Sequence, residues 1–156
     1  MSFFSRQHFE LLQKWHGQRK IRGDVEHDLA YSELSEAYTL VKRWAESLQK
    51  SLFLEGYVSI NRKPTNQAQH FASYLWGKVY PHEDSPKALA YTVGINTEGL
   101  DLKIDTVGLS DKDPIRLKYL ALRGDYSRSG FVSELPLDEC LTMNFEQLLN
   151  WSKAQI

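Results

Sequence analysis

The stretch YLWGKVYP, residues 74–81, alternates rings and a lysine with Leu, Gly and Val. If it forms a β-strand, every second side chain points to the same face of the sheet. The resulting row consists of Tyr74, Trp76, Lys78 and Tyr80. Rings beside a cation suit the stacking of an exposed or extruded base, because every base has a π-face and its backbone is anionic. This row therefore indicates a nucleic-acid-binding surface.

The loop before this strand adds residue types that contact phosphates and bases in protein–DNA complexes. They are Arg62, Lys63, Asn66 and Gln67. Acids are interspersed among the further cations of the chain, and such runs also occur on ordinary solvated faces. These cations are Arg19, Lys20 and Arg22, and then Lys112, Arg116, Lys118, Arg123 and Arg128.

A second interpretation of the aromatic row is structural. Large rings dominate protein cores, and a central strand covered on both faces has the same pattern. Lys78 in the middle of the row argues against a buried core. A third interpretation is that the same aromatic face binds a protein partner. The sequence leaves DNA binding, a structural role and protein binding all open.

A metal-dependent nuclease is the enzymatic alternative. Asp84 followed by Asp101-x-Lys103 resembles a nuclease core in which acids hold a divalent cation and a lysine positions the attacking water. Short patterns of this kind arise often by chance. Asp101 and Lys103 equally fit the solvent face of an amphipathic strand whose other face is Leu100, Leu102 and Ile104.

Other catalytic motifs are missing from the sequence. It contains no G-x-x-x-x-G-K-[ST], no H-E-x-x-H and no G-x-S-x-G. Cys140, the single cysteine, follows two acids in LDEC, a setting that disfavours a reactive thiolate. PHED, residues 81–84, predicts a solvated turn. We therefore expect a binding module without catalytic residues, bound metal or cofactor.

Length and composition favour a single globular domain over residues 1–156, because 156 residues is about one domain and the hydrophobic content is 42%. The formal net charge is −1, so any DNA contact must depend on a local basic patch. A lone cysteine and the lack of a long apolar run favour a cytoplasmic protein with no membrane contact.

The hydrophobic periodicity predicts an α+β fold: a mostly antiparallel twisted sheet of four to six strands, with N-terminal helices and a C-terminal helix. Residues 17–31 predict a polar connector, and 113–125 fit a helix or a strand, with alternation slightly favouring the strand. The predicted helices are 5–16, 32–56 and 143–154, and the predicted strands are 57–62, 70–81, 88–95, 100–109 and 131–133.

The order of these parts, with YLWGKVYP and LAYTVGIN, resembles the N-terminal recognition domains of McrB-type modification-dependent restriction systems. The resemblance covers about a quarter of the chain and fails in the loop 61–69. It implies an antiviral defence protein that binds DNA and flips a methylated cytosine into an aromatic pocket. Trp76 with Tyr74 or Tyr91 would then sandwich the base, Tyr91 standing on the neighbouring strand.

The same resemblance implies two partners besides DNA: a motor domain in a longer chain and a separate nuclease. The C-terminal sequence NFEQLLNWSKAQI ends in a predicted helix without a clear C-cap. We therefore expect the chain to be the N-terminal module of a longer protein.

Overall fold

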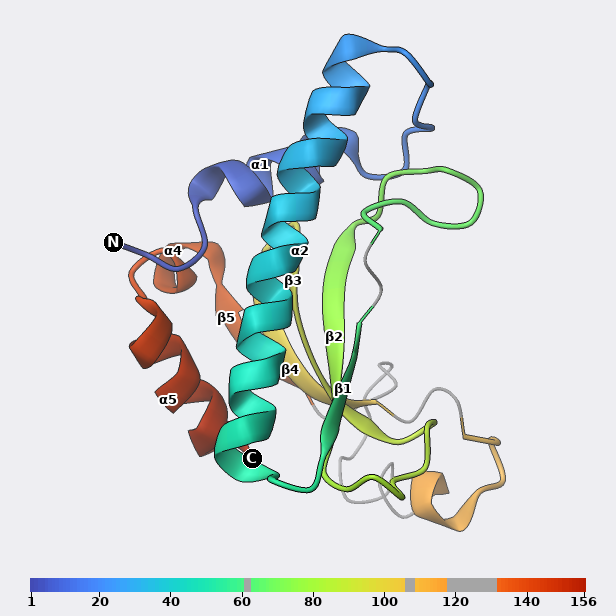
Figure 1. The fold of residues 1–156 in the computed structure, drawn as a ribbon, viewed down its shortest axis with the longest axis vertical. Helices are drawn as coiled ribbons and strands as arrows, with labels where there is room; N and C mark the ends of the chain where they lie inside the picture. Colours follow the sequence, from blue (N-terminus) through green and yellow to red (C-terminus); the bar gives the residue numbers. More distant parts are fainter. Residues whose placement is uncertain (61–62, 106–108, 118–131) are drawn as a thin grey trace.

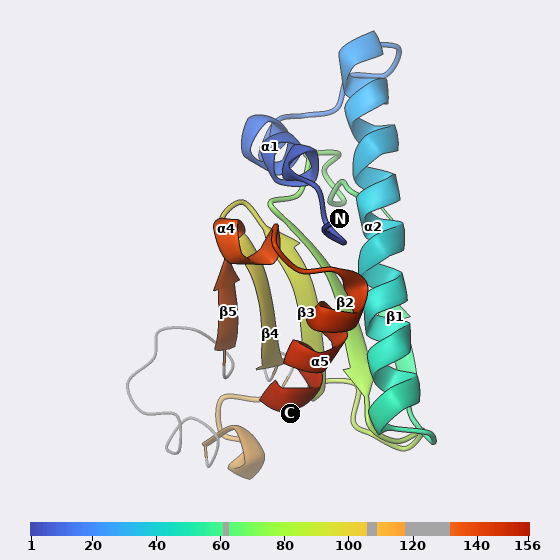
Figure 2. The same ribbon diagram turned by 90° about the vertical axis from the view of Figure 1, so that its left-hand side faces the viewer.

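The computed structural model of the chain describes residues 1–60, 63–105, 109–117 and 132–156. Helices come first, a five-stranded antiparallel sheet follows, and a helix closes the fold, which confirms the predicted α+β class (Figure 1). The helices α1, α2 and α5 lie on one side of the sheet, as Figure 2 shows face-on.

The five strands are arranged in the sheet in their sequence order, each antiparallel to the next. The predicted antiparallel sheet is therefore confirmed, and its described strands form a simple meander. Its register places Trp76 opposite Gly94, and Gly94 opposite Asp101, so these three residues form one row across the sheet. The strands are β1 (Tyr57–Ile60), β2 (Tyr74–Tyr80), β3 (Ala90–Asn96), β4 (Gly99–Asp105) and β5 (Val132–Pro136).

Helix α1 (Arg6–Trp15) begins after Ser5, as predicted. The Ser5 backbone N–H donates to His8 Nδ1 at 3.1 Å, which satisfies a donor that the helix itself cannot pair. The chain then turns at Gly17, whose φ of +79° favours a residue without a Cβ.

Helix α2 (Val25–Leu52) begins seven residues earlier than predicted, so the connector is shorter than the sequence indicates. Asp24 is the N-cap, and its carboxylate accepts a hydrogen bond from the His27 backbone N–H at 3.0 Å. The buried stripe includes His27 and Ala30, which do not stand out as apolar in the sequence. The prediction missed this first part because Val25 and its neighbours are exposed or charged.

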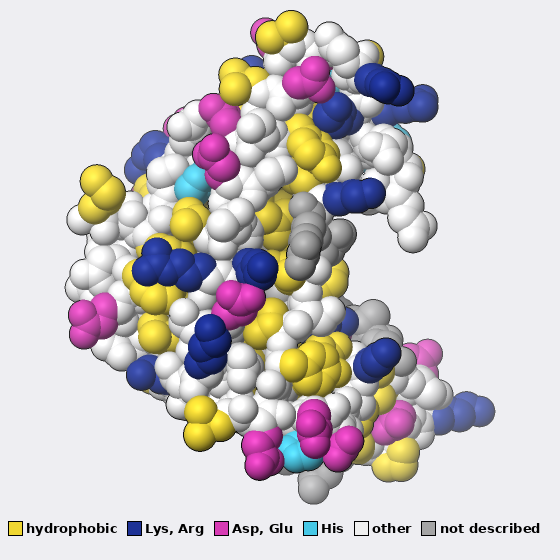
Figure 3. Space-filling view, viewed as in Figure 1, with side chains coloured by type: hydrophobic (Ala, Val, Ile, Leu, Met, Phe, Trp, Pro, Cys, Tyr) yellow, Lys and Arg dark blue, Asp and Glu magenta, His cyan; other side chains and the backbone are white. Residues whose placement is uncertain are grey.

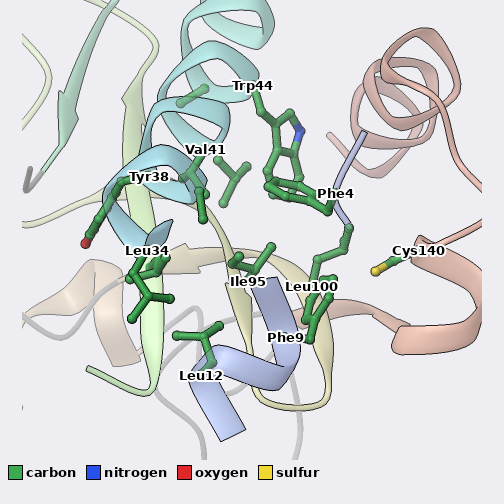
Figure 4. Packing of buried hydrophobic residues seen from close by; sticks show 14 of the residues in the cluster. Phe4, Phe9, Leu12, Leu34, Tyr38, Val41, Trp44, Ile95, Leu100 and Cys140 are labelled. Carbon is green, nitrogen blue, oxygen red and sulfur yellow. The ribbon is translucent and has the colours of Figure 1, made fainter. Parts of the chain in front are cut away.

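The hydrophobic core lies between α2 and the sheet, and Figure 4 shows Trp44 and Val41 of α2 facing Phe4 and Ile95. Helix α5 (Phe145–Gln155) begins after the cap Asn144, within two residues of the predicted start at 143. Its Ser152 is fully buried because its hydroxyl accepts from the Trp44 indole N–H at 2.8 Å. The short helix α4 (Leu137–Cys140) was not predicted.

The strand favoured for 113–125 is wrong where the structure describes it. Residues 114–117 form a helical turn that begins at Pro114. The Asp113 carboxylate accepts from the Ile115 N–H at 2.8 Å, and the Leu117 N–H donates to the Asp113 carbonyl at 3.0 Å. The rest of this prediction, and Phe131 of the predicted strand 131–133, lie outside the described residues.

Within the described parts of the chain, no helix combines the length and the apolar character needed to cross a membrane.

Candidate nucleic-acid interface

The two faces of β2 differ as the alternation predicts. Leu75 and Val79 are fully buried in the core beneath α2, and a Cβ at Gly77 would lie 3.2 Å from Ala45 of that helix. We call the opposite side of the sheet, which points away from α2, the outer face. It carries Tyr74, Trp76, Lys78 and Tyr80 of β2 together with Asp101, Lys103 and Asp105 of β4.

Tyr74 lies flat across the middle strand of this face. Its hydroxyl reaches from β2 over Gly94 and donates a short hydrogen bond to the Asp101 carboxylate. Lys103 Nζ lies 4.6 Å from the centroid of the Tyr74 ring. Burial, and then the negative charge of Asp101, raise the pKa of the Tyr74 hydroxyl far above its ordinary value. With Gly94 and Lys103 both against its ring, Tyr74 is placed to hold the sheet together rather than to stack a base.

The ring and the hydroxyl of Tyr80 also make contacts within the protein. Its ring stacks on Tyr57 of β1, with centroids 4.5 Å apart and an interplanar angle of 13°. Its hydroxyl donates to the Lys87 carbonyl oxygen at 2.7 Å, and only 4% of the residue is exposed. Burial and then Tyr57 raise the pKa of its hydroxyl, so it stays a neutral donor. For Tyr80, these contacts favour the structural interpretation of the row.

Lys78 forms an ion pair across the outer face. Its Nζ lies 3.6 Å from Asp105 Oδ2 and 5.5 Å from the centroid of the Trp76 ring. The cation is therefore partly neutralised by an acid on β4, while remaining close enough to Trp76 for a cation–π interaction.

Trp76 is a half-buried ring whose side chain has no hydrogen bond or ring stacking with any of the residues that the structure describes. Its direct neighbour on β3 is Gly94, over which the Tyr74 ring lies. The contact with Lys78 gives it a ring beside a cation, the combination that binds stacked bases. Of the predicted rings, Trp76 has the surroundings best suited to stacking.

The predicted Trp76–Tyr91 sandwich is wrong. Tyr91 pairs with Val79, whose side chain points into the core, so Tyr91 lies on the inner side of the sheet. Its ring stacks instead on Phe53, with centroids 5.7 Å apart and an interplanar angle of 10°. The register of β2 and β3 keeps Tyr91 and Trp76 on opposite faces.

The predicted loop residues have different roles. Arg62 lies outside the described residues, while Lys63 and Gln67 are exposed. Asn66 is exposed too, but its side-chain oxygen accepts from the His70 backbone N–H at 3.0 Å. Asn66 therefore helps to fix the loop, and Lys63 adds an exposed positive charge to it.

A basic rim adjoins this loop. Arg19, Lys20 and Arg22 line a shallow hollow with Gln69, and Lys20 Nζ is paired with Asp28 Oδ1 at 3.0 Å. Figure 3 shows the molecule hollowed on one side, with Lys and Arg side chains at both ends of the hollow and acidic side chains mixed with those at the lower end. The sequence contains these cations, but it is backbone pairing between residues 17–20 and 69–71, including that of Arg19 with His70, that brings them beside the 63–70 loop.

The residues of the nuclease alternative do not come together. Asp101 and Lys103 share the outer face, as predicted. Asp84 is exposed in the loop after Tyr80, where its carboxylate groups with His82 and Glu83. Asp101 is instead buried on β4, where its carboxylate accepts a hydrogen bond from Tyr74.

Acidic ligands do gather elsewhere, in the exposed loop after β2. His82, Glu83 and Asp84 offer atoms within 4.8 Å of one another, and His82 Nε2 lies 3.2 Å from Glu55 Oε2. These contacts among exposed side chains suffice to explain the arrangement of a solvated turn. Burial raises the pKa of the Cys140 thiol to about 11, so this cysteine is protonated at neutral pH.

Comparison of the chain with protein-family models, with curated proteins and with solved structures gave no match. The resemblance to McrB-type domains therefore stays a prediction, and a function must be argued from the outer face itself.

Proposed function

We propose that this chain is a DNA-binding module that holds an exposed or extruded base on Trp76. The observation that carries the proposal is the position of Trp76, a half-buried ring beside Lys78 on the outer face of the sheet. Arg19, Arg22 and Lys63 would contact phosphates from the rim. Phosphate contacts supply affinity and register, while the stacked base supplies selectivity.

The electrostatics favour binding at one end of the hollow. The net charge of −1 gives no general attraction to DNA, and Asp101 and Asp105 lie on the outer face itself. Two exposed arginines, Arg19 and Arg22, lie at the rim just before α2. We infer that the phosphate backbone follows this rim, because the carboxylates of Asp101 and Asp105 repel it from the outer face.

Methylated cytosine is the first base to test, because the resemblance to McrB-type domains implies it. The motor domain and the partner nuclease remain proposals on the same ground. An exposed base that carries an added methyl group would gain contact area on the indole ring.

The deciding experiment is a titration of labelled duplexes, unmodified and 5-methylcytosine-bearing, with the wild type and Trp76→Ala. Loss of the stacked base should weaken binding by about 1–3 kcal/mol, with an unchanged urea midpoint. Trp76→Phe should restore part of the affinity. If Trp76→Ala loses stability and binding to the same extent, Trp76 is a structural residue and not a base-stacking one. If the wild type binds neither duplex, a protein partner for this face is favoured.

A further inference from the structure

We propose that Ile21 is an apolar wedge that enters the base stack of double-stranded DNA from the minor groove, between phosphate contacts made by Arg19 and Arg22. This inference rests on the proposed DNA-binding function. It assigns the loop 17–23 a role separate from that of Trp76.

The loop is held rigidly at both ends. The Gly17 N–H donates to the Phe71 carbonyl at 2.8 Å, and the Lys20 N–H donates to the Gln69 carbonyl at 2.7 Å. Gly17 and Gly23 have φ values of +79° and +83°, which tighten the two turns. A segment fixed in this way presents its tip at little further cost in conformational entropy.

Ile21 itself is anchored through its backbone. Its N–H donates to Nδ1 of the buried His27 at 2.8 Å, and His27 packs edge-on against Trp15 and Phe71. The Ile21 carbonyl accepts from the Asp24 N–H at 3.2 Å. The side chain nevertheless points outward, with 59% of the residue exposed.

An exposed aliphatic residue is ordinary by itself, so the argument depends on what surrounds this one. Arg19 and Arg22 are both exposed and line the same hollow as Ile21. Proteins that bind the minor groove combine arginines with apolar wedges, which separate two base steps and kink the duplex. A rigid tip with an isoleucine between arginines has this composition.

The mechanism predicts which DNA substrates are sensitive to Ile21. Separating two intact base pairs costs stacking energy, and burial of the Ile21 side chain between them offsets part of that cost. A central mismatch has already weakened the stack, so less depends on the wedge.

The test measures affinity for an intact duplex and for the same duplex with one central mismatch, using Ile21→Ala and the control Leu54→Ala. Leu54 is 87% exposed and lies beyond the opposite end of α2. Ile21→Ala should weaken binding to the intact duplex about tenfold and to the mismatched duplex much less. Leu54→Ala should change neither affinity, and both variants should keep the wild-type urea midpoint.

A 2-aminopurine beside the central step gives a second readout, because its fluorescence rises when it unstacks. The wild type should increase this signal, and Ile21→Ala should not. If Ile21→Ala weakens binding to both duplexes equally, or leaves affinity and fluorescence unchanged, Ile21 is not a wedge. The proposed DNA-binding function would not be affected by that result. If the wild type binds neither duplex, the proposed function fails first.

Discussion

The Tyr74 ring lies so close to Gly94 that a Cβ built on Gly94 would be 2.5 Å from Tyr74 Cε2. The same Cβ would be 2.6 Å from the Leu75 carbonyl oxygen, which is backbone and cannot rotate away. Glycine at this position therefore allows a tyrosine on β2 to reach an aspartate on β4 across the intervening strand.

Gly94→Ala should destabilise the protein by about 2–3 kcal/mol, because the methyl group must displace the Tyr74 ring or shift the strand. Gly77→Ala is the matched control on the neighbouring strand, where the nearest atom to a new Cβ is Ala45 Cβ at 3.2 Å. It should cost about 1 kcal/mol, at the low end for an added core methyl, because the three atoms nearest to the new Cβ all belong to side chains. Urea denaturation measures both, and equal losses would contradict the crossing of Tyr74 over Gly94.

Tyr74→Phe separates the hydroxyl from the ring. Removal of the hydroxyl takes a hydrogen-bond donor from the buried Asp101, so we expect a loss of about 1–3 kcal/mol in the free energy of unfolding. DNA affinity should stay within about twofold of the wild type, because the Tyr74 ring is covered by Gly94 and Lys103. A variant of normal stability that binds DNA much more weakly would show that Tyr74 contacts the ligand.

The sequence predicted the fold well because its signals are local. Alternation in 70–81 identified β2 and both of its faces, and Asn144 and Ser5 marked the starts of their helices. The early start of α2 was missed because its buried positions there are His27 and Ala30, and neither carries the large apolar side chain that periodicity detects.

The site was less predictable because it depends on register and on pairing between distant segments. Tyr91 was assigned to the wrong face, since its orientation follows from its pairing with Val79. The basic rim depends on the pairing of Arg19 with His70, 51 positions apart in the sequence numbering. Nothing in the local sequence around either residue indicates that contact.

The basic rim predicts a specific salt dependence of DNA binding. Each phosphate contact contributes about 0.9 to the slope of log K against log salt concentration, so Arg19→Ala with Arg22→Ala should reduce the slope by about 2. Arg6→Ala with Lys50→Ala removes two exposed cations from α1 and from the end of α2, and serves as the charge-matched control. A slope that falls equally in both double variants would mean that general charge, and not the rim, determines affinity.

His8 predicts a dependence of stability on pH. Burial lowers the pKa of its imidazole below the ordinary 6.5, an effect that Glu36 and Glu33 partly oppose. Its Nδ1 accepts from the Ser5 N–H, and protonation would remove that acceptor. Since the unfolded chain takes up this proton at a higher pH than the folded chain, the free energy of unfolding should fall as the pH drops through and below 6.5.

His8→Gln tests this assignment, because a glutamine at the same helical position can accept from the Ser5 N–H without titrating. The variant should match the wild type in urea denaturation at pH 7.5 and lose less stability at pH 5.5. His16→Gln, which removes an exposed histidine just beyond the same helix, should keep the wild-type pH dependence. If His8→Gln loses as much stability as the wild type between the two pH values, the acid sensitivity arises at another group.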